Sequence, residues 1–181
     1  MVFEKQDLDG VYIITPELFE DERGYFFESF RELEFQNKLN INFVQDNQAF
    51  SKDSNVIRGL HYQIDNAQGK LIHVISGAIR DVVVDIRIGS PNFGKSFAAI
   101  LNEQNHKMLY VPEGFAHGYL VLENDTVVHY KCTNYYNINS EFGIRWDDPE
   151  ININWGISDP ILSDKDKILP YLKKQKNLPK F

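Results

Sequence analysis

The stretch AIRDVVVDIRI, residues 78–88, alternates its side chains with a period of two. One face takes Val82, Val84, Ile86 and Ile88, and the other takes Asp81, Val83, Asp85 and Arg87. This period is typical of a β-strand. Directly before it, KLIHVISG (residues 70–77) repeats the alternation, and Gly77 stands where a turn would join two antiparallel strands. The centre of the chain is therefore predicted to be a β-hairpin.

Short segments of the same kind flank this hairpin on both sides, separated by turn-like stretches such as SPNFG and LENDT. A helix is predicted over Arg31–Leu39, and the Lys-rich tail after residue 149 is expected to form a short helix or a loop. About ten short antiparallel strands with little helix predict an all-β jelly roll or a related barrel. The further predicted strands are Val11–Ile14, Tyr25–Phe30, Phe43–Ser51, Val56–Gln63, Lys95–Leu101, Lys107–Val111, His117–Glu123 and Thr126–Thr133.

Length and composition predict a single globular domain over residues 1–181. Hydrophobic residues make up 43% and charged residues 25%, and the aromatics (13 Phe, 9 Tyr, 2 Trp) favour strands. A net charge of −7 disfavours duplex nucleic acid as a partner, although a local basic cluster can still bind a small anion. No apolar stretch approaches the roughly 20 residues of a membrane span. The start lacks the apolar core of a signal peptide, and Cys132 is the only cysteine. We therefore expect a reducing, cytoplasmic setting.

Two histidine motifs are candidate sites for chemistry. PEGFAHG (residues 112–118) combines a tight turn with His117 at the start of a strand, which is compatible with a structural histidine or with the second box of a cupin barrel. RGLHYQ (residues 58–63) carries His61, but a metal-binding cupin would have a second His at Gln63 and an acid near Lys70. Gln is a poor metal ligand and a cation opposes a metal, so the sequence predicts no metal site. His61 and His117 remain as candidate general bases.

Three other segments are compatible with a function or with plain packing. DERGYFFESF (residues 21–30) places Phe26, Glu28 and Phe30 on one strand face, which suits a ligand or an interface, or a simple edge strand. YKCTNYY (residues 130–136) contains an inward phenol, Tyr130, and a Tyr pair able to stack on a flat ring. LSDKD (residues 162–166) is either a solvated charge run or part of a site.

Taken together, these segments resemble the dTDP-4-dehydrorhamnose 3,5-epimerases, the RmlC-like cupins. The resemblance runs from about Gly10 to Asp166 and rests on DERGYFFESF, FVQDN, VIRGLHYQ, NAQGKL, PEGFAHGY, YKCTNYY and SDKD in this order. It implies a cupin-type jelly roll with an N-terminal strand exchanged across a homodimer. It also implies epimerisation at carbons 3 and 5 of a dTDP-4-keto-6-deoxy sugar, without metal or other cofactor, in dTDP-L-rhamnose biosynthesis.

The resemblance also implies roles for individual residues. His61 would be the base and Asp166 the carboxylate that orients it, as in catalytic triads. Lys70 would stabilise an enolate oxygen, and Tyr130 would return the proton from the opposite face. Arg23, Arg58 and Lys165 would hold the diphosphate, Tyr136 would stack on thymine, and His117 would line the sugar pocket. Further substrate contacts would come from Phe26, Glu28, Gln45, Asn47 and Glu141, with the segment of Phe26 and Glu28 reaching the partner's site.

One local prediction follows from the pleat of the strand over 56–63. Strict alternation would point Arg58 and His61 to opposite faces of the strand. Both can serve one site only if Gly59 interrupts the pleat, as a bulge or a close backbone approach would.

Three alternatives stay open from the sequence. Relatives on this scaffold that act on one carbon only, or that isomerise the keto group, are the first. A metal-dependent cupin is the second, and it would need three or more N or O ligands around an open position. A non-catalytic cupin that binds sugar nucleotides is the third.

Overall fold

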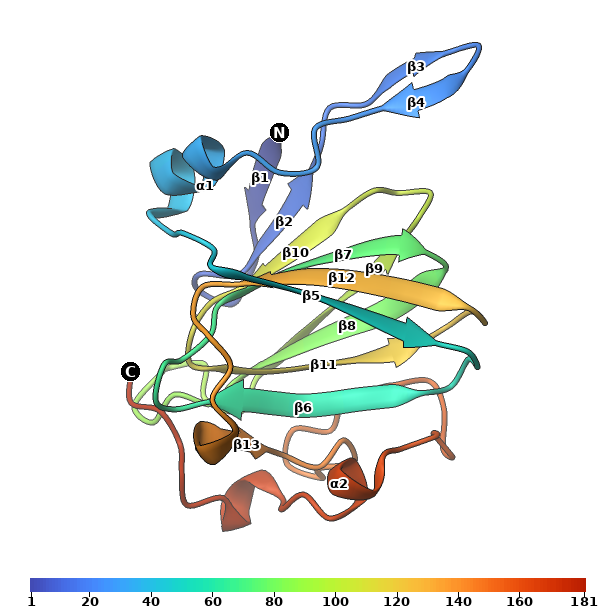
Figure 1. Ribbon diagram of the computed structural model, residues 1–181. Helices are drawn as coiled ribbons and strands as arrows, with labels where there is room; N and C mark the ends of the chain where they lie inside the picture. Colours follow the sequence, from blue (N-terminus) through green and yellow to red (C-terminus); the bar gives the residue numbers. More distant parts are fainter.

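Two antiparallel sheets form the body of the protein in the computed structural model, which describes all 181 residues (Figure 1). The six-stranded sheet has the order β1-β2-β10-β7-β12-β5, the five-stranded sheet has the order β13-β6-β11-β8-β9, and β3 and β4 pair separately. The predicted all-β architecture is confirmed. The strands are β1 (Val2–Lys5), β2 (Tyr12–Thr15), β3 (Phe19–Asp21), β4 (Gly24–Phe26), β5 (Gln45–Ser51), β6 (Ile57–Gln63), β7 (Lys70–Ser76), β8 (Ala78–Asp85), β9 (Ser96–Asn102), β10 (Met108–Val111), β11 (Phe115–Val121), β12 (Thr126–Cys132) and β13 (Glu141–Gly143).

Helices are few and short, as predicted. The helix α1 (Glu32–Leu39) has acidic residues in its first turn and Lys38 in its last, which suits the helix dipole. It ends at Asn40, whose left-handed backbone (φ 55°) is a common way to stop a helix. The C-terminal part contributes α2 (Asp164–Lys167) and two short 3₁₀ helices, Ile138–Ser140 and Leu172–Lys174.

The central core lies between the two large sheets. Ile79 and Val83 of β8 pack there with Ile72 and Val74 of β7, and all four side chains are buried. The alternate residues of β8, Val82 and Val84, belong to a second cluster on the outer face of the five-stranded sheet. This outer cluster is covered by the C-terminal part of the chain, through Ile144, Ile151, Trp155 and Leu172.

Residues 86–88 do not continue the predicted strand, because β8 ends at Asp85. The Asp85 carboxylate accepts hydrogen bonds from the backbone and side chain of Arg87 and from the Ser90 hydroxyl. These bonds turn the chain out of the sheet. Ile88 is consequently 52% exposed and does not share the buried face predicted for it.

The hairpin β3–β4 projects away from the body of the molecule (Figure 1). The predicted strand Tyr25–Phe30 is therefore wrong beyond Phe26, because β3 offers only three residues for pairing. Phe26 is 68% exposed, and Glu28 forms an ion pair with Arg31 instead of sharing a strand face with Phe26.

Candidate active site

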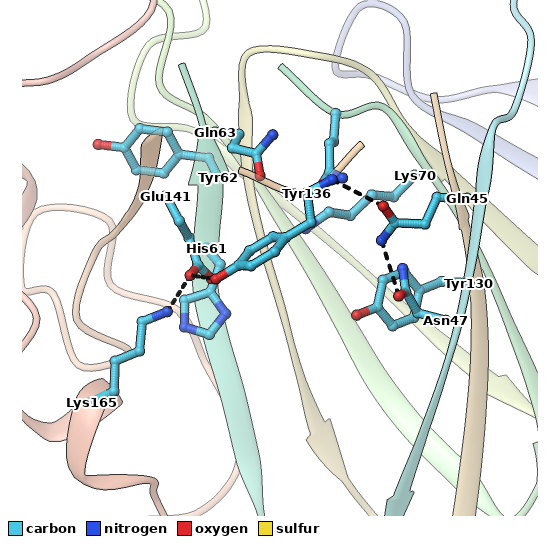
Figure 2. A pocket seen from close by; sticks show the side chains of 11 residues that line it. Gln45, Asn47, His61, Tyr62, Gln63, Lys70, Tyr130, Tyr136, Glu141 and Lys165 are labelled. Carbon is cyan, nitrogen blue, oxygen red and sulfur yellow. Dashed lines mark hydrogen bonds and ion pairs between the residues drawn. The ribbon is translucent and has the colours of Figure 1, made fainter. Parts of the chain in front are cut away.

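Two adjoining cavities lie between the large sheets and α2, with volumes of about 380 and 520 Å³. Both are lined by His61, Lys70, Tyr130 and Lys165, which come from β6, β7, β12 and α2. The four shared residues stand where the two cavities meet, and Figure 2 shows them around the first cavity. Segments that are distant in sequence thus converge on one pocket.

A histidine–carboxylate pair links β6 to α2. His61 Nε2 lies 2.6 Å from Asp166 Oδ1, and Asp166 is only 4% exposed. Ser163 caps α2 by accepting a hydrogen bond from the Asp166 backbone N–H. This bond fixes the position of the Asp166 backbone, from which the carboxylate extends toward His61. Burial alone would raise the pKa of Asp166, but the hydrogen bond and charge of His61, together with hydrogen bonds from Ser163 and the Gly59 backbone, hold this pKa below its ordinary value. The ionised carboxylate is suited to orienting the imidazole.

Lys70 and Tyr130 face the same pocket from neighbouring strands, because β7 and β12 pair antiparallel. The Lys70 ammonium forms no ion pair with any carboxylate of the chain. Burial lowers the pKa of Lys70 and raises the pKa of Tyr130. The pocket therefore combines a lysine that has no carboxylate partner with a phenol that keeps its proton beyond its ordinary range.

At the pocket, Glu141 collects two donors on one oxygen. Its Oε2 accepts from Tyr136 Oη at 2.6 Å and from Lys165 Nζ at 2.5 Å (Figure 2). Burial would raise the pKa of Glu141, yet the bonds from Lys165 and Tyr136 hold it below its ordinary value. The bond to Glu141 in turn raises the pKa of Tyr136 to about 12.

Arg58 and His61 both line the second cavity, so the pleat is interrupted as predicted. The register of β6 against β11 shifts between His117 and Tyr119. Gly59 has a φ of +115°, and a Cβ on it would stand 2.6 Å from the His117 carbonyl oxygen. Only glycine permits this close approach of the two strands.

His117 lines the second cavity and is oriented by a partner that the sequence analysis did not identify. Its Nε2 lies 2.8 Å from Oδ1 of Asp81, which is fully buried on β8. Asp81 falls on the face of β8 that carries Val83, toward the central core. A buried carboxylate on an otherwise apolar face is a signal for such a partner, because buried charges are normally paired.

Eleven of the fourteen predicted site residues line these cavities, and three do not. Gln45 and Asn47 of β5 lie on the first cavity, where Gln45 donates to Asn47 and Asn47 to the Cys132 sulfur. The three outside are Arg23, Phe26 and Glu28, which lie on or after the projecting hairpin. Within one chain these three residues lie outside the pocket, because the hairpin projects from the body and Arg23 pairs with Asp21. The reach of Phe26 and Glu28 into a partner's site stays a prediction. The lining residues that sequence reasoning missed include Gln68, Tyr62 and Tyr119, and Gln63 was considered only as a missing metal ligand.

The chain has no group of three or more His, Cys, Asp or Glu side chains arranged to hold a metal ion. None of its helices combines the length and apolar character that crossing a membrane requires.

Comparison with known proteins identifies the relatives of this pocket. The family model described as dTDP-4-dehydrorhamnose 3,5-epimerase matches residues 5–174. The chain belongs to this family. An epimerase of that name from Methanothermobacter thermautotrophicus is 47% identical over 169 residues, which cover 91% of each chain. The predicted family membership is thus confirmed, and with it the assignment as an isomerase.

Solved structures confirm the cupin jelly roll. The epimerase RmlC from Legionella pneumophila, in complex with dTDP-4-keto-L-rhamnose, has a TM-score of 0.94 at 40% identity, covering 99% of this chain and 98% of its own. ChmJ from Streptomyces bikiniensis, a 3'-monoepimerase in complex with dTDP-quinovose, has a TM-score of 0.92 at 30% identity, covering 98% and 92%. The same fold therefore holds relatives that differ in how many carbons they invert.

Proposed function

We propose that this protein inverts carbons 3 and 5 of dTDP-4-keto-6-deoxy-D-glucose to give dTDP-4-keto-L-rhamnose, a step in dTDP-L-rhamnose biosynthesis. The observation that carries the proposal is the His61–Asp166 pair beside Lys70 and Tyr130 in one pocket. These groups supply a base, its orienting carboxylate, a cation and a proton donor. We also propose that the reaction takes place in the cytoplasm, where the lone Cys132 stays reduced.

The 4-keto group makes the hydrogens on carbons 3 and 5 acidic. His61 takes the proton from carbon, and the C–H electron pair moves toward the carbonyl to form an enolate. Lys70 stabilises the charge on the enolate oxygen, and Asp166 stabilises the imidazolium. Tyr130 then gives a proton to the opposite face of the carbon and regains one from solvent, while His61 releases to solvent the proton that it took. Repeating the cycle at the second carbon completes the double inversion.

The remaining pocket residues hold the substrate in this proposal. Arg58 and Lys165 are placed to bind the diphosphate, for which guanidinium and ammonium groups are suited. Tyr136 stacks on the thymine ring, and His117 contacts the sugar. Gln45, Asn47 and Glu141 supply hydrogen bonds.

We further propose a homodimer in which the hairpin of one subunit completes the pocket of the other. The hairpin projects from the body and exposes the large apolar side chains Phe19, Tyr25 and Phe26, which supports a role at an interface. Arg23 and Glu28 would then act on the partner's substrate, which accounts for their distance from the pocket of their own chain.

Product analysis tests the proposed reaction. The purified protein is incubated with dTDP-4-keto-6-deoxy-D-glucose in the presence and absence of EDTA, and the product is reduced with borohydride and identified by its NMR coupling constants. We expect products inverted at both carbons, in equal yield with and without EDTA. Loss of activity with EDTA, restored by Fe, Mn or Zn, would instead support a metal-dependent cupin.

The second candidate is a single-carbon epimerase, favoured by the likeness to the monoepimerase ChmJ. Sequence identity favours double inversion, because the 3,5-epimerase from Methanothermobacter thermautotrophicus is 47% identical to this chain and ChmJ is 30% identical. A product inverted at one carbon only would establish the second candidate.

A further inference from the structure

The loop after β12 carries Tyr136, and glutamine side chains bind the backbone of four successive residues in it. Gln68 Nε2 donates to the Asn134 carbonyl at 2.7 Å, and Gln63 Nε2 donates to the Tyr135 carbonyl at 3.2 Å. The Tyr136 N–H donates to Gln45 Oε1 at 2.9 Å, and the Asn137 N–H donates to Gln63 Oε1, also at 2.9 Å. We call these three glutamines the amide clamp.

The amide clamp draws on both large sheets. Gln45 begins β5 of the six-stranded sheet, Gln63 ends β6 of the five-stranded sheet, and Gln68 lies just before β7. The loop backbone is therefore fixed to two surfaces that are themselves held by the central core. Such anchoring limits the positions that a side chain on the loop can take.

Gln63 is the central member of the amide clamp. Its side chain is only 4% exposed, and its amide nitrogen also donates to the Asn66 carbonyl at 2.7 Å. All three hydrogen bonds of the Gln63 side chain are thus made to backbone groups. Leaving a buried amide without hydrogen-bond partners costs free energy. Loop conformations that break these bonds are therefore disfavoured, and one conformation predominates.

The ring that the loop carries has little support of its own. Tyr136 is 50% exposed, and its hydroxyl is bound only by Glu141 (Figure 2). The position of the ring is therefore set by the amide clamp at the backbone end and by Glu141 at the hydroxyl end. A ring held in place before binding loses less conformational entropy when a flat ligand stacks on it.

We propose that Gln63 is a positioning residue for nucleotide recognition, acting through the backbone of residues 135–137 to fix the ring of Tyr136. The inference rests on the proposed function, in which Tyr136 stacks on the base. Gln63 stands where a metal-binding cupin has a histidine ligand, so this position has a recognition role in place of a metal-binding one.

The first test is calorimetric binding of dTDP to the wild type and to Gln63→Met. We expect the substitution to weaken dTDP binding roughly five- to tenfold, the range for one freed side chain. KM should rise by a similar factor while kcat changes less than about twofold, a split that general destabilisation would not produce. An unchanged dTDP affinity, or a fall in kcat without a change in KM, would overturn the proposal.

Gln175→Met is the matched control. The Gln175 amide also donates to a backbone carbonyl, that of Gly143 at 2.9 Å, and accepts from a backbone N–H, but it does not line the pocket. We expect it to leave dTDP affinity at the wild-type value. An equal loss of affinity in this control would show that any lost backbone anchor has the same effect, and would overturn a specific role for Gln63.

The second test is a double-mutant cycle with Tyr136→Ala. If Gln63 acts through the ring, Gln63→Met should cause no further loss of dTDP affinity in the Tyr136→Ala background. The same loss in both backgrounds would overturn the proposal. If Gln63→Met does not fold, Gln68→Met carries the same expectation, because Gln68 binds the same loop. If the wild type does not bind dTDP, the proposed function itself is refuted. If the wild type and Gln63→Met bind dTDP equally well, only this inference is refuted.

Discussion

At the scale of single residues, Lys70 and Tyr130 define the pH range in which the pocket can work. Burial lowers the pKa of the lysine and raises the pKa of the phenol. The proposed chemistry needs a charged lysine and a protonated tyrosine. As pH rises, Lys70 therefore loses its charge at a lower pH than an ordinary lysine, whereas Tyr130 keeps its proton to a higher pH than an ordinary tyrosine.

We therefore predict that the alkaline fall in kcat belongs to Lys70. It should be centred below the ordinary lysine pKa of about 10.4. Lys70→Met should lower kcat by about 10²–10³, the usual cost of one group that stabilises a developing oxyanion. Lys70→Arg should retain weak activity without this alkaline fall, since arginine stays charged. A pH profile of kcat checks both variants, and an unchanged alkaline fall in Lys70→Arg would contradict the assignment.

At the same scale, sequence reasoning found the candidate residues and Asp166 as the partner of His61, but it missed the partner of His117. His61, Lys70, Tyr130 and Asp166 stand in recognisable motifs, so their convergence on one pocket could be expected. Asp81 behind His117 could not be paired in advance, because the cross-strand register of β8 and β11 decides which residue faces it. The amide clamp was missed for a similar reason, since glutamines bound to a loop backbone leave no periodic pattern.

At the scale of elements, hydrophobic alternation located most strands, and its failures have physical causes. The predicted strand over 78–88 ends early because the Asp85 carboxylate binds Arg87 and Ser90. The predicted strand Tyr25–Phe30 ends at Phe26 because its partner β3 has only three residues. The strands β1, β3 and β13 were not predicted, because they are three or four residues long and lack the continuous apolar run of the equally short β2 and β10.

The close approach of β6 and β11 gives a prediction for Gly59. Gly59→Ala should lower the free energy of unfolding by several kcal/mol and so unfold at a lower urea concentration than the wild type. The substitution adds a backbone clash with the His117 carbonyl to the strain of a positive φ. Gly24→Ala is the matched control: its φ is +125°, but a Cβ there meets nothing within 4 Å. It should cost only about 1–3 kcal/mol. Equal costs in urea unfolding would show that β6 and β11 can move apart.

At the scale of the whole molecule, net charge is a poor guide to the ligand. The chain carries −7, yet the proposed substrate is a diphosphate. Arg58, Lys70 and Lys165 converge on the cavities from three separate elements, and this local field decides which ligand is attracted. Composition indicated the fold class, whereas the charge of the pocket needed the structure.

The proposed hairpin exchange predicts complementation between subunits. His61→Ala and Arg23→Ala dimers should each have low activity, because every site lacks one residue. In a mixed dimer, isolated with two different affinity tags, the Arg23→Ala subunit keeps its own His61 and receives an intact hairpin from its partner. Its activity should reach about half of the wild type, since one of the two sites is complete. Activity no higher than in the parent variants, or full activity of the Arg23→Ala dimer, would contradict the exchange.

The proposed reaction depends above all on proton abstraction by His61 at both carbons next to the keto group. Incubation with dTDP-4-keto-6-deoxy-D-glucose in D₂O, followed by proton NMR, measures it directly. We expect the wild type to replace the hydrogens on carbon 3 and carbon 5 with deuterium, and His61→Ala to bind dTDP but exchange neither. Exchange at one carbon only, or undiminished exchange at both carbons in His61→Ala, would contradict it.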